Sequence, residues 1–168
     1  MASCCSIDIN NYFDSIIIGE DYFSLSMAFH SISFGMKTAL VVKKDLDIAI
    51  MKFLERFDSY IERDTTMPKS LEDTKEDFHL SLFEDNKLTI KQNGISIEKK
   101  EIEGNIIIIN EQYAVNFKND YFEGGFFYKD KIIKIQPEFW LSYFSNDDEQ
   151  KEIWDASEYF VKKLIVKN

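Results

Sequence analysis

Carboxylate side chains concentrate near the C-terminal end of the chain. Residues 145–160, SNDDEQKEIWDASEYF, carry six of them around Trp154. Carboxylates that converge in a cleft can work as a general acid and base, whereas carboxylates on an open surface attract a positively charged partner. Acids on helix faces and turns are solvated by default, so we expect the second role here. The residues predicted to attract the partner are Asp147, Asp148, Glu152 and Asp155.

A second stretch sets aromatic rings among acids. Residues 119–130, NDYFEGGFFYKD, mix five aromatic residues with three acids. An exposed ring supplies apolar contact area, and an arginine can stack on it, so such rings anchor a cationic partner well. Packing of the same rings inside the protein is the alternative, since about half of the side chains of a strand face the core. The residues predicted to contact the partner here are Asp120, Tyr121, Phe122 and Glu123.

Motifs for metal binding or nucleophilic catalysis are absent from the sequence. His30 and His79 stand apart without a second histidine at ligand spacing, and we interpret both as structural residues. Cys4 and Cys5 are adjacent, which strains a disulfide and gives no zinc spacing. No GxSxG, GxxxxGK[ST] or GxGxxG loop occurs. We therefore expect a protein that is not an enzyme, with no catalytic residues, no metal and no cofactor.

The charge balance limits the partners. The chain has 20 Lys and Arg against 30 Asp and Glu, a net charge of −10. Nucleic-acid backbones and anionic lipids attract basic surfaces, so we expect neither direct nucleic-acid binding nor membrane binding. No apolar stretch is long enough to cross a bilayer and the N-terminus does not resemble a signal peptide, which predicts a cytoplasmic protein.

The first acidic group lies on a predicted C-terminal helix, residues 146–166. Its apolar side chains fall on two neighbouring rows that form one broad packing face, and Trp154 belongs to that face. Asn146 with an acid three residues later resembles a capping box, and acids in the first turn complement the helix dipole. Glu152 and Asp155 need another explanation, because they extend the negative charge along the solvent face beyond the first turn.

The remaining elements come from periodicity and turn chemistry. Residues 45–63 predict an amphipathic helix, and Ser70 is a candidate cap for a short helical turn at 71–77. Asn93-Gly94 predicts a two-residue hairpin that pairs Ile90 with Ile97. Residues 23–34 fit both a strand and a helical stripe, and we favour the strand. Further strands are predicted at 78–83, at 105–110 as a central strand covered on both faces, and at 113–117, 125–128 and 131–135.

These elements predict one α+β domain over residues 1–168. We expect an antiparallel meander of about six strands, packed by the helix at about 45–63 and the helix at about 146–166.

The protein is a small acidic chain with acid-and-aromatic stretches such as DDEQKEIWD and NDYFEGGFFY. In this overall character it resembles the immunity proteins of bacterial polymorphic toxin systems, including contact-dependent growth inhibition. The resemblance rests on this profile across the chain and on no specific motif. It implies that the protein binds a cognate, basic toxin domain and blocks its active site. Asp147, Asp148, Glu152 and Asp155 would then steer the partner, and Tyr121 and Phe122 would anchor it.

Two other classes stay open at this point. One is an acidic mimic of DNA that inhibits a nucleic-acid-binding protein. The other is a small-molecule-binding or hydrolytic domain, which predicts a concave pocket with converging polar groups around His30 or His79.

Overall fold

Two apolar runs near the N-terminus form neighbouring parallel strands. In the computed structural model, which describes residues 11–85, 87–91, 93–110, 121–123, 126–129, 132–135 and 149–164, β1 (Tyr12–Ile18) pairs with β2 (Thr38–Val42). Every residue of β2 and the last four of β1 are buried. Strands covered on both faces have continuous apolar sequences rather than alternating ones, which is typical of parallel sheets.

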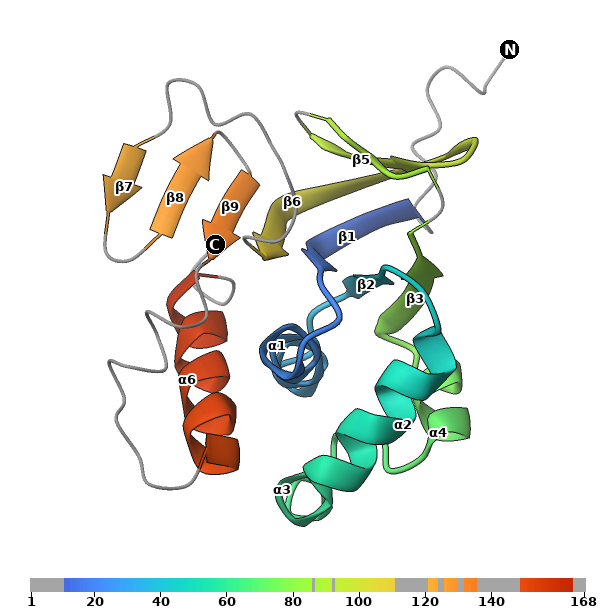
Figure 1. Ribbon diagram of the computed structural model, residues 1–168, viewed down its shortest axis with the longest axis vertical. Helices are drawn as coiled ribbons and strands as arrows, with labels where there is room; N and C mark the ends of the chain where they lie inside the picture. Colours follow the sequence, from blue (N-terminus) through green and yellow to red (C-terminus); the bar gives the residue numbers. More distant parts are fainter. Residues whose placement is uncertain are drawn as a thin grey trace.

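The described strands form one mixed sheet, whose main path runs β3-β2-β1-β6-β9-β8-β7 (Figure 1). The strands from β3 to β9 on this path are parallel, and β8 and β7 are antiparallel to their neighbours. The α+β class is confirmed, but the predicted antiparallel meander is wrong. The other strands on the path are β3 (Leu80–Glu84), β6 (Lys100–Asn110), β7 (Tyr121–Glu123), β8 (Phe126–Lys129) and β9 (Ile132–Ile135).

The crossover from β1 to β2 is α1 (Tyr22–Ser33), so the predicted strand over residues 23–34 is wrong. Every residue from Phe23 to Ile32 is buried, because α1 packs on the sheet between the C-terminal helix on one side and α2 (Leu46–Arg56) on the other. A helix that is buried on all sides has no polar stripe, and its periodicity is therefore weak. This missing helix also explains the wrong topology, since parallel neighbours need a long crossover connection.

The predicted helix at 45–63 consists of two helices, α2 (Leu46–Arg56) and α3 (Asp58–Glu62), with a break at the buried Phe57. The predicted cap at Ser70 is confirmed, because its hydroxyl accepts a hydrogen bond from the amide of Asp73 at the start of α4 (Leu71–Glu76). The C-terminal helix is confirmed as α6 (Glu149–Leu164).

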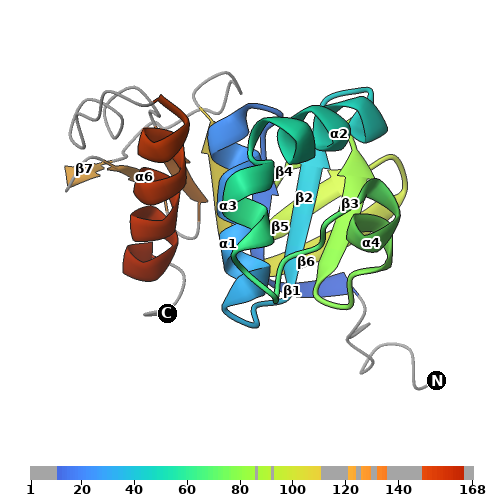
Figure 2. The ribbon, with the colours of Figure 1, turned by 90° about the horizontal axis from the view of Figure 1, so that it is seen from below.

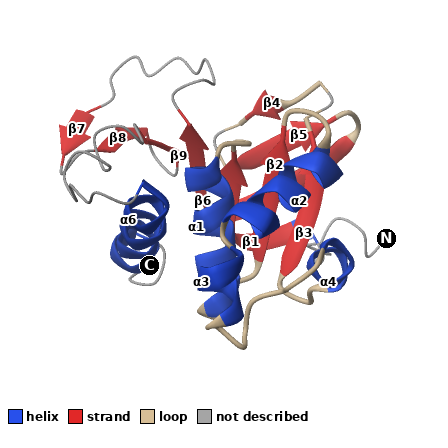
Figure 3. Ribbon diagram, turned by 60° about the horizontal axis from the view of Figure 1, so that its bottom comes forward, coloured by secondary structure: helices blue, strands red, loops and turns tan. Residues whose placement is uncertain are grey.

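The sheet separates two apolar clusters. On one face, Ile17, Leu40 and Ile108 pack against the helices, and on the other, their strand neighbours pack against the hairpin of β4 (Thr89–Ile90) and β5 (Gly94–Ile97). Figures 2 and 3 show the helices gathered on one side of the sheet. The prediction that residues 105–110 form a central strand covered on both faces is confirmed for the four isoleucines, Ile106 to Ile109.

The Asn93-Gly94 hairpin is confirmed, but its register is wrong. Ile90 pairs with Ile95 instead of Ile97, and the amide of Lys91 donates a hydrogen bond of 2.8 Å to the carbonyl of Gly94, so Gly94 belongs to β5 rather than to the loop. A shift of two residues leaves every side chain on its predicted face, and the hairpin isoleucines still join the same apolar cluster. The predicted strands at 78–83, 125–128 and 131–135 correspond to β3, β8 and β9, and the predicted strand at 113–117 lies outside the described residues.

Candidate functional site

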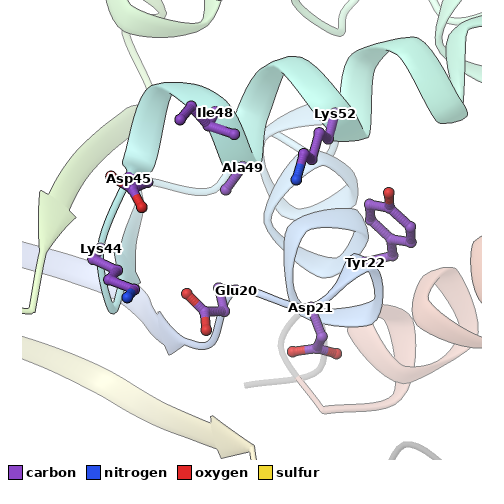
Figure 4. Close-up of a pocket in the computed structure, with 8 residues that line it drawn as sticks. All are labelled: Glu20, Asp21, Tyr22, Lys44, Asp45, Ile48, Ala49 and Lys52. Atoms are coloured by element: carbon purple, nitrogen blue, oxygen red, sulfur yellow. The ribbon is translucent and has the colours of Figure 1, made fainter.

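A cleft lies at the carboxyl ends of β1 and β2, where the chain leaves each strand for the following helix (Figure 4). Its volume is about 440 Å³. The loop after β1 and the first residue of α1 form one wall, and the loop after β2 and the first turns of α2 form the other. The residues that line this strand-end cleft are Glu20, Asp21, Tyr22, Lys44, Asp45, Ile48, Ala49 and Lys52.

Strand pairing brings the two walls together. Ile18 lies opposite Val41, and the amide of Gly19 donates a hydrogen bond of 3.0 Å to the carbonyl of Val41. Because β1 and β2 are parallel, the residues that follow them emerge at the same edge of the sheet. Open sheets of parallel strands bind their ligands at this edge, outside the carboxyl ends of the strands.

Three ionised side chains point into the cleft. Figure 4 shows Glu20, Lys44 and Lys52 directed toward the space between the two walls. Within the described part of the chain, none of the three makes a hydrogen bond or an ion pair. Two ammonium groups are thus available to an anion, and one carboxylate is available to a hydroxyl or an ammonium group.

Apolar surface completes the lining. Ile48 on α2 is 51% exposed, whereas Ile50 and Phe53 of the same helix are buried in the core. Tyr22 is half-buried, and its ring meets that of Phe57 edge-on with the centroids 5.5 Å apart. Apolar walls with a few polar groups that fix orientation are typical of small-molecule sites.

The turn from β1 into α1 is tightly packed. Asp21 caps α1, and its carboxylate accepts hydrogen bonds from the amide of Ser24 at 3.3 Å and from the Ser24 hydroxyl at 2.6 Å. A Cβ atom on Gly19 would lie 2.3 Å from that hydroxyl oxygen, so a larger residue forces the turn to move. The spacing Gly19-x-Asp21-x-x-Ser24 matches the first glycine of the G-x-G-x-x-G loop that holds a pyrophosphate in dinucleotide-binding folds, and it departs at the other two.

The predicted partner-binding residues are only partly described. Asp120, Asp147 and Asp148 lie outside the described residues. Tyr121, Phe122 and Glu123 form β7 at the end of the sheet path, antiparallel to β8. Glu152 and Asp155 lie on α6 and are both half-buried.

Two of the four acids of α6 form ion pairs with lysines of the same helix. Asp155 forms an ion pair with Lys151 at 2.6 Å, and Glu158 forms one with Lys162 at 3.2 Å, both one helical turn apart. Such exposed pairs stabilise a helix by a few tenths of a kcal/mol, about 0.3–0.5 kcal/mol each. Part of the acidity that the sequence places on this helix is therefore matched by lysines of the same helix.

A second groove, of about 490 Å³, lies beside α6. Trp154 forms its aromatic wall and packs against His30, Phe57 and Tyr60, with ring centroids 4.3, 6.1 and 5.5 Å away. This contact agrees with the interpretation of Trp154 as a packing residue. The residues that line this α6 groove are His30, Tyr60, Arg63, Asp64, Thr65, Lys151, Trp154, Asp155 and Glu158.

His30 is a buried, hydrogen-bonded side chain of the α6 groove. Its Nε2 lies 3.1 Å from the carbonyl oxygen of Trp154, and its Nδ1 lies 3.7 Å from a carboxylate oxygen of Glu158. Burial lowers the pKa of His30 to about 4, against the opposing effect of Glu158. The ring is therefore neutral at pH 7, as expected of a structural histidine, although it lies on a helix rather than a strand. His79, in contrast, is exposed.

Asp64 lies at the rim of the same groove. Partial burial alone would raise the pKa of its carboxyl, but hydrogen bonds from Thr66 and Ser33 and the charge of Lys69 hold the pKa below its usual value. Asp64 is therefore an anchored, ionised acceptor that joins α1 to the segment after α3.

The described ranges contain neither a cluster of metal ligands nor a helix that could span a membrane. No three His, Cys, Asp or Glu side chains of these residues lie close enough together to hold a metal ion. None of the helices in these ranges has the length and apolar character to cross a membrane.

Comparison with known proteins leaves the chain without an assigned family. No protein-family model matches it, and no curated protein matches it. Among solved structures, it is similar to the Cu(II) complex of the HOCl-induced flavoprotein disulfide reductase RclA from Escherichia coli, with 15% identity and a TM-score of 0.41. The similarity covers 60% of this chain but only 28% of the reductase, and it is too distant to assign a function.

Proposed function

We propose that this protein is a small-molecule-binding domain and that its ligand occupies the strand-end cleft. The observation that carries the proposal is the convergence of Glu20, Lys44 and Lys52, none of them paired within the described chain, in one concave space at the carboxyl ends of parallel strands. The volume of about 440 Å³ falls within the range of ligand pockets, roughly 300–1,000 Å³. Side chains that need no internal partner can exchange their bound water for a ligand with little rearrangement of the fold.

The lining indicates the chemistry of the ligand. Lys44 and Lys52 favour a carboxylate or phosphate group, and Glu20 favours a hydroxyl or amino group on the same molecule. Ile48 and the ring of Tyr22 favour a compact apolar portion between these polar groups. The protein as a whole is strongly acidic and repels polyanions, so Lys44 and Lys52 attract an anion only at short range. A polar metabolite with a single negative charge therefore fits the cleft better than a polyanion. The prediction that the protein is not an enzyme stays a prediction.

Binding to the cleft can be tested with a panel of amino acids, hydroxy acids, sugar phosphates and mononucleotides. Chemical shifts of the labelled protein would be followed by NMR, and any hit would be titrated by calorimetry against the Lys44→Gln/Lys52→Gln variant. We expect the double substitution to weaken binding by about 100-fold or more, because each of the two lost ionic hydrogen bonds contributes about 1.5 kcal/mol or more, which is about tenfold.

Lys99→Gln is the matched control, since Lys99 is an exposed lysine in the turn between β5 and β6, away from the cleft. If Lys99→Gln weakened ligand binding equally, the effect would be due to the net charge of the protein and not to contacts in the cleft. A ligand that changes chemical shifts only outside the cleft, and that binds both variants with unchanged affinity, would rule out the strand-end cleft as its site.

A second candidate is the toxin-inhibitor function that the sequence profile implies. The observation in its favour is the α6 groove, where Trp154 offers a ring to an arginine and Asp64, Asp155 and Glu158 supply carboxylates. In this proposal the groove, together with Glu152, receives a basic side chain of a cognate toxin domain. Charge reversal at Glu152 and Asp155 should then slow association with the toxin more than it lowers stability. Unchanged association in stopped-flow measurements would remove this surface from the proposal.

A further inference from the structure

Another hollow of the surface adjoins the strand-end cleft. Its volume is about 420 Å³, and Tyr22 and Lys52 line both spaces, so the two share a border. The C-terminal half of α2 forms one wall, and α3 and α6 contribute one residue each near their beginnings. The residues that line this α2 hollow are Tyr22, Lys52, Glu55, Arg56, Asp58 and Gln150.

One row of side chains on α2 runs along both spaces. Ile48, Lys52 and Arg56 follow one another at intervals of four residues, which places them one above the other on the helix surface. Ile48 lines the cleft, Arg56 lines the α2 hollow, and Lys52 lines both. The row covers about 12 Å along the helix axis, because each helical residue adds about 1.5 Å. A ligand confined to the strand-end cleft would leave the far end of this row uncovered.

The charged groups in the second half of the row are not paired with one another. Lys52, Glu55 and Arg56 make no ion pair or side-chain hydrogen bond within the part of the chain that the structure describes. On α6, in contrast, lysines pair with carboxylates one helical turn away. An arginine binds a carboxylate through two parallel N–H groups, so Arg56 beside Lys52 offers a position for a carboxylate.

The opposite end of the cleft offers the complementary charge. In the view of Figure 4, Lys52 and Tyr22 border the part of the cleft that adjoins the α2 hollow, and Glu20 and Lys44 lie toward the other end. The carboxylate of Glu20 is suited to an ammonium group. A negative group at one end, an apolar wall and a cationic pair at the other end fit an elongated molecule that carries both charges.

We propose that the strand-end cleft and the α2 hollow together bind a short peptide of about three residues. Its N-terminal ammonium group binds Glu20, its first side chain lies against Ile48 and the ring of Tyr22, and its C-terminal carboxylate lies between Lys52 and Arg56. An extended tripeptide is about 10 Å long, which matches the length of the row on α2. This inference rests on the proposed function of the cleft and names the class of its ligand.

A structural role of Arg56 is the simpler explanation, because a positive charge in the last turn stabilises the end of a helix. Two substitutions separate the roles. Arg56→Lys keeps the charge at the helix end but lacks the planar fork that holds a carboxylate through two N–H groups, and Arg56→Gln removes both. If Arg56 only stabilises α2, neither substitution changes the peptide affinity of the folded protein.

Calorimetric titration with leucine, Leu-Gly and Leu-Gly-Gly provides the test, because these compounds keep the ammonium group and the apolar side chain and move the carboxylate farther away. We expect the wild-type protein to bind Leu-Gly-Gly at least about tenfold more tightly than leucine, since the tripeptide gains the contact with Arg56. Arg56→Gln should remove this advantage and Arg56→Lys should reduce it, while the affinity for leucine stays unchanged. Arg63→Gln is the matched control, because Arg63 is the other arginine of the chain, is exposed and lines neither space.

Two results would overturn the inference. One is that Leu-Gly-Gly does not bind, or binds no more tightly than leucine. The other is that its advantage over leucine persists in Arg56→Gln or is lost equally in Arg63→Gln. Failure of the proposed function is distinguishable: if another compound binds in the cleft and is weakened by Lys44→Gln/Lys52→Gln while the peptides do not bind, the cleft keeps its function and only the peptide assignment falls. If neither kind of compound binds there, both fall.

Discussion

The strand-end cleft and the α6 groove contain the same kinds of side chain but use them differently. Both have two basic side chains, several carboxylates and at least one aromatic ring. In the groove, Asp155 and Glu158 pair with lysines of their own helix, and Trp154 packs on three other rings. In the cleft, Glu20, Lys44 and Lys52 make no such pairs within the described chain. Composition alone thus does not distinguish a ligand site from a stabilising contact, whereas the pairing of the charges does.

The largest difference between the two regions should appear on removal of their apolar side chains. Trp154→Ala should destabilise the protein by about 3 kcal/mol, because truncation of large core rings costs about 3–5 kcal/mol and Trp154 is half-buried. Ile48→Ala in the cleft should cost less than about 1 kcal/mol, since Ile48 is 51% exposed. Urea unfolding measures both values. Equal losses would break the distinction between a packed groove and an open cleft.

The pH dependence of stability should also trace to the groove. The pKa of His30 is lowered from 6.5 to about 4 in the folded protein, so the unfolded chain binds more protons between these two values. Its contribution is fully present above pH 6.5 and is lost as the pH falls toward 4, by roughly 3 kcal/mol at most. Glu158 and Asp64 oppose this loss and Lys162 adds to it.

Unfolding at pH 7, 5.5 and 4.5 measures this loss, and His30→Gln should flatten it. His79→Gln is the control, because His79 is the other histidine of the chain and lies exposed outside the α6 groove. A profile that responds equally to both substitutions would mean that His30 does not link protonation to the packing of α1 against α6.

The cleft has its own structural requirement, at the turn before α1. Gly19→Ala should destabilise the protein by about 1–3 kcal/mol, because the new Cβ atom would lie 2.3 Å from the Ser24 hydroxyl oxygen. The double variant Gly19→Ala/Ser24→Gly should recover part of the loss, since it removes the clashing hydroxyl. Additive losses in thermal unfolding would contradict the packing of Gly19 against Ser24 as the cause.

The sequence predicts the groove side of the molecule better than the cleft side, for a physical reason. α6 has one apolar face and one charged face, so its period is visible, and Trp154 could be placed on the packing face. α1 is buried on all sides, and a uniformly buried helix has no such period. Because α1 is missing from the prediction, β1 and β2 could not be placed as parallel neighbours, and Lys44 and Glu20 could not be brought together.

A signal for the cleft is nevertheless present in the sequence. The apolar run of β1 ends at Gly19, and Asp21 follows at a capping distance before Ser24. A second apolar run ends at Val42, immediately before Lys43 and Lys44. Continuous runs of this kind are typical of parallel strands, and the polar residues that follow such strands meet at one edge of the sheet. Alternation, the pattern of antiparallel strands, does not detect them.

The smallest expected effect provides the sharpest test of charge pairing. Lys151→Gln removes the ion pair with Asp155 and should cost about 0.3–0.5 kcal/mol at low salt, with a smaller cost in 1 M salt. Lys44→Gln should change stability by less than that, because Lys44 has no partner to lose within the described chain. Since both lysines are exposed, differences in burial do not explain a difference between the variants. Thermal denaturation of both variants at two salt concentrations would measure the loss of stability. A larger, salt-sensitive loss for Lys44→Gln would show that the charges of the cleft stabilise the fold and are not available to a ligand.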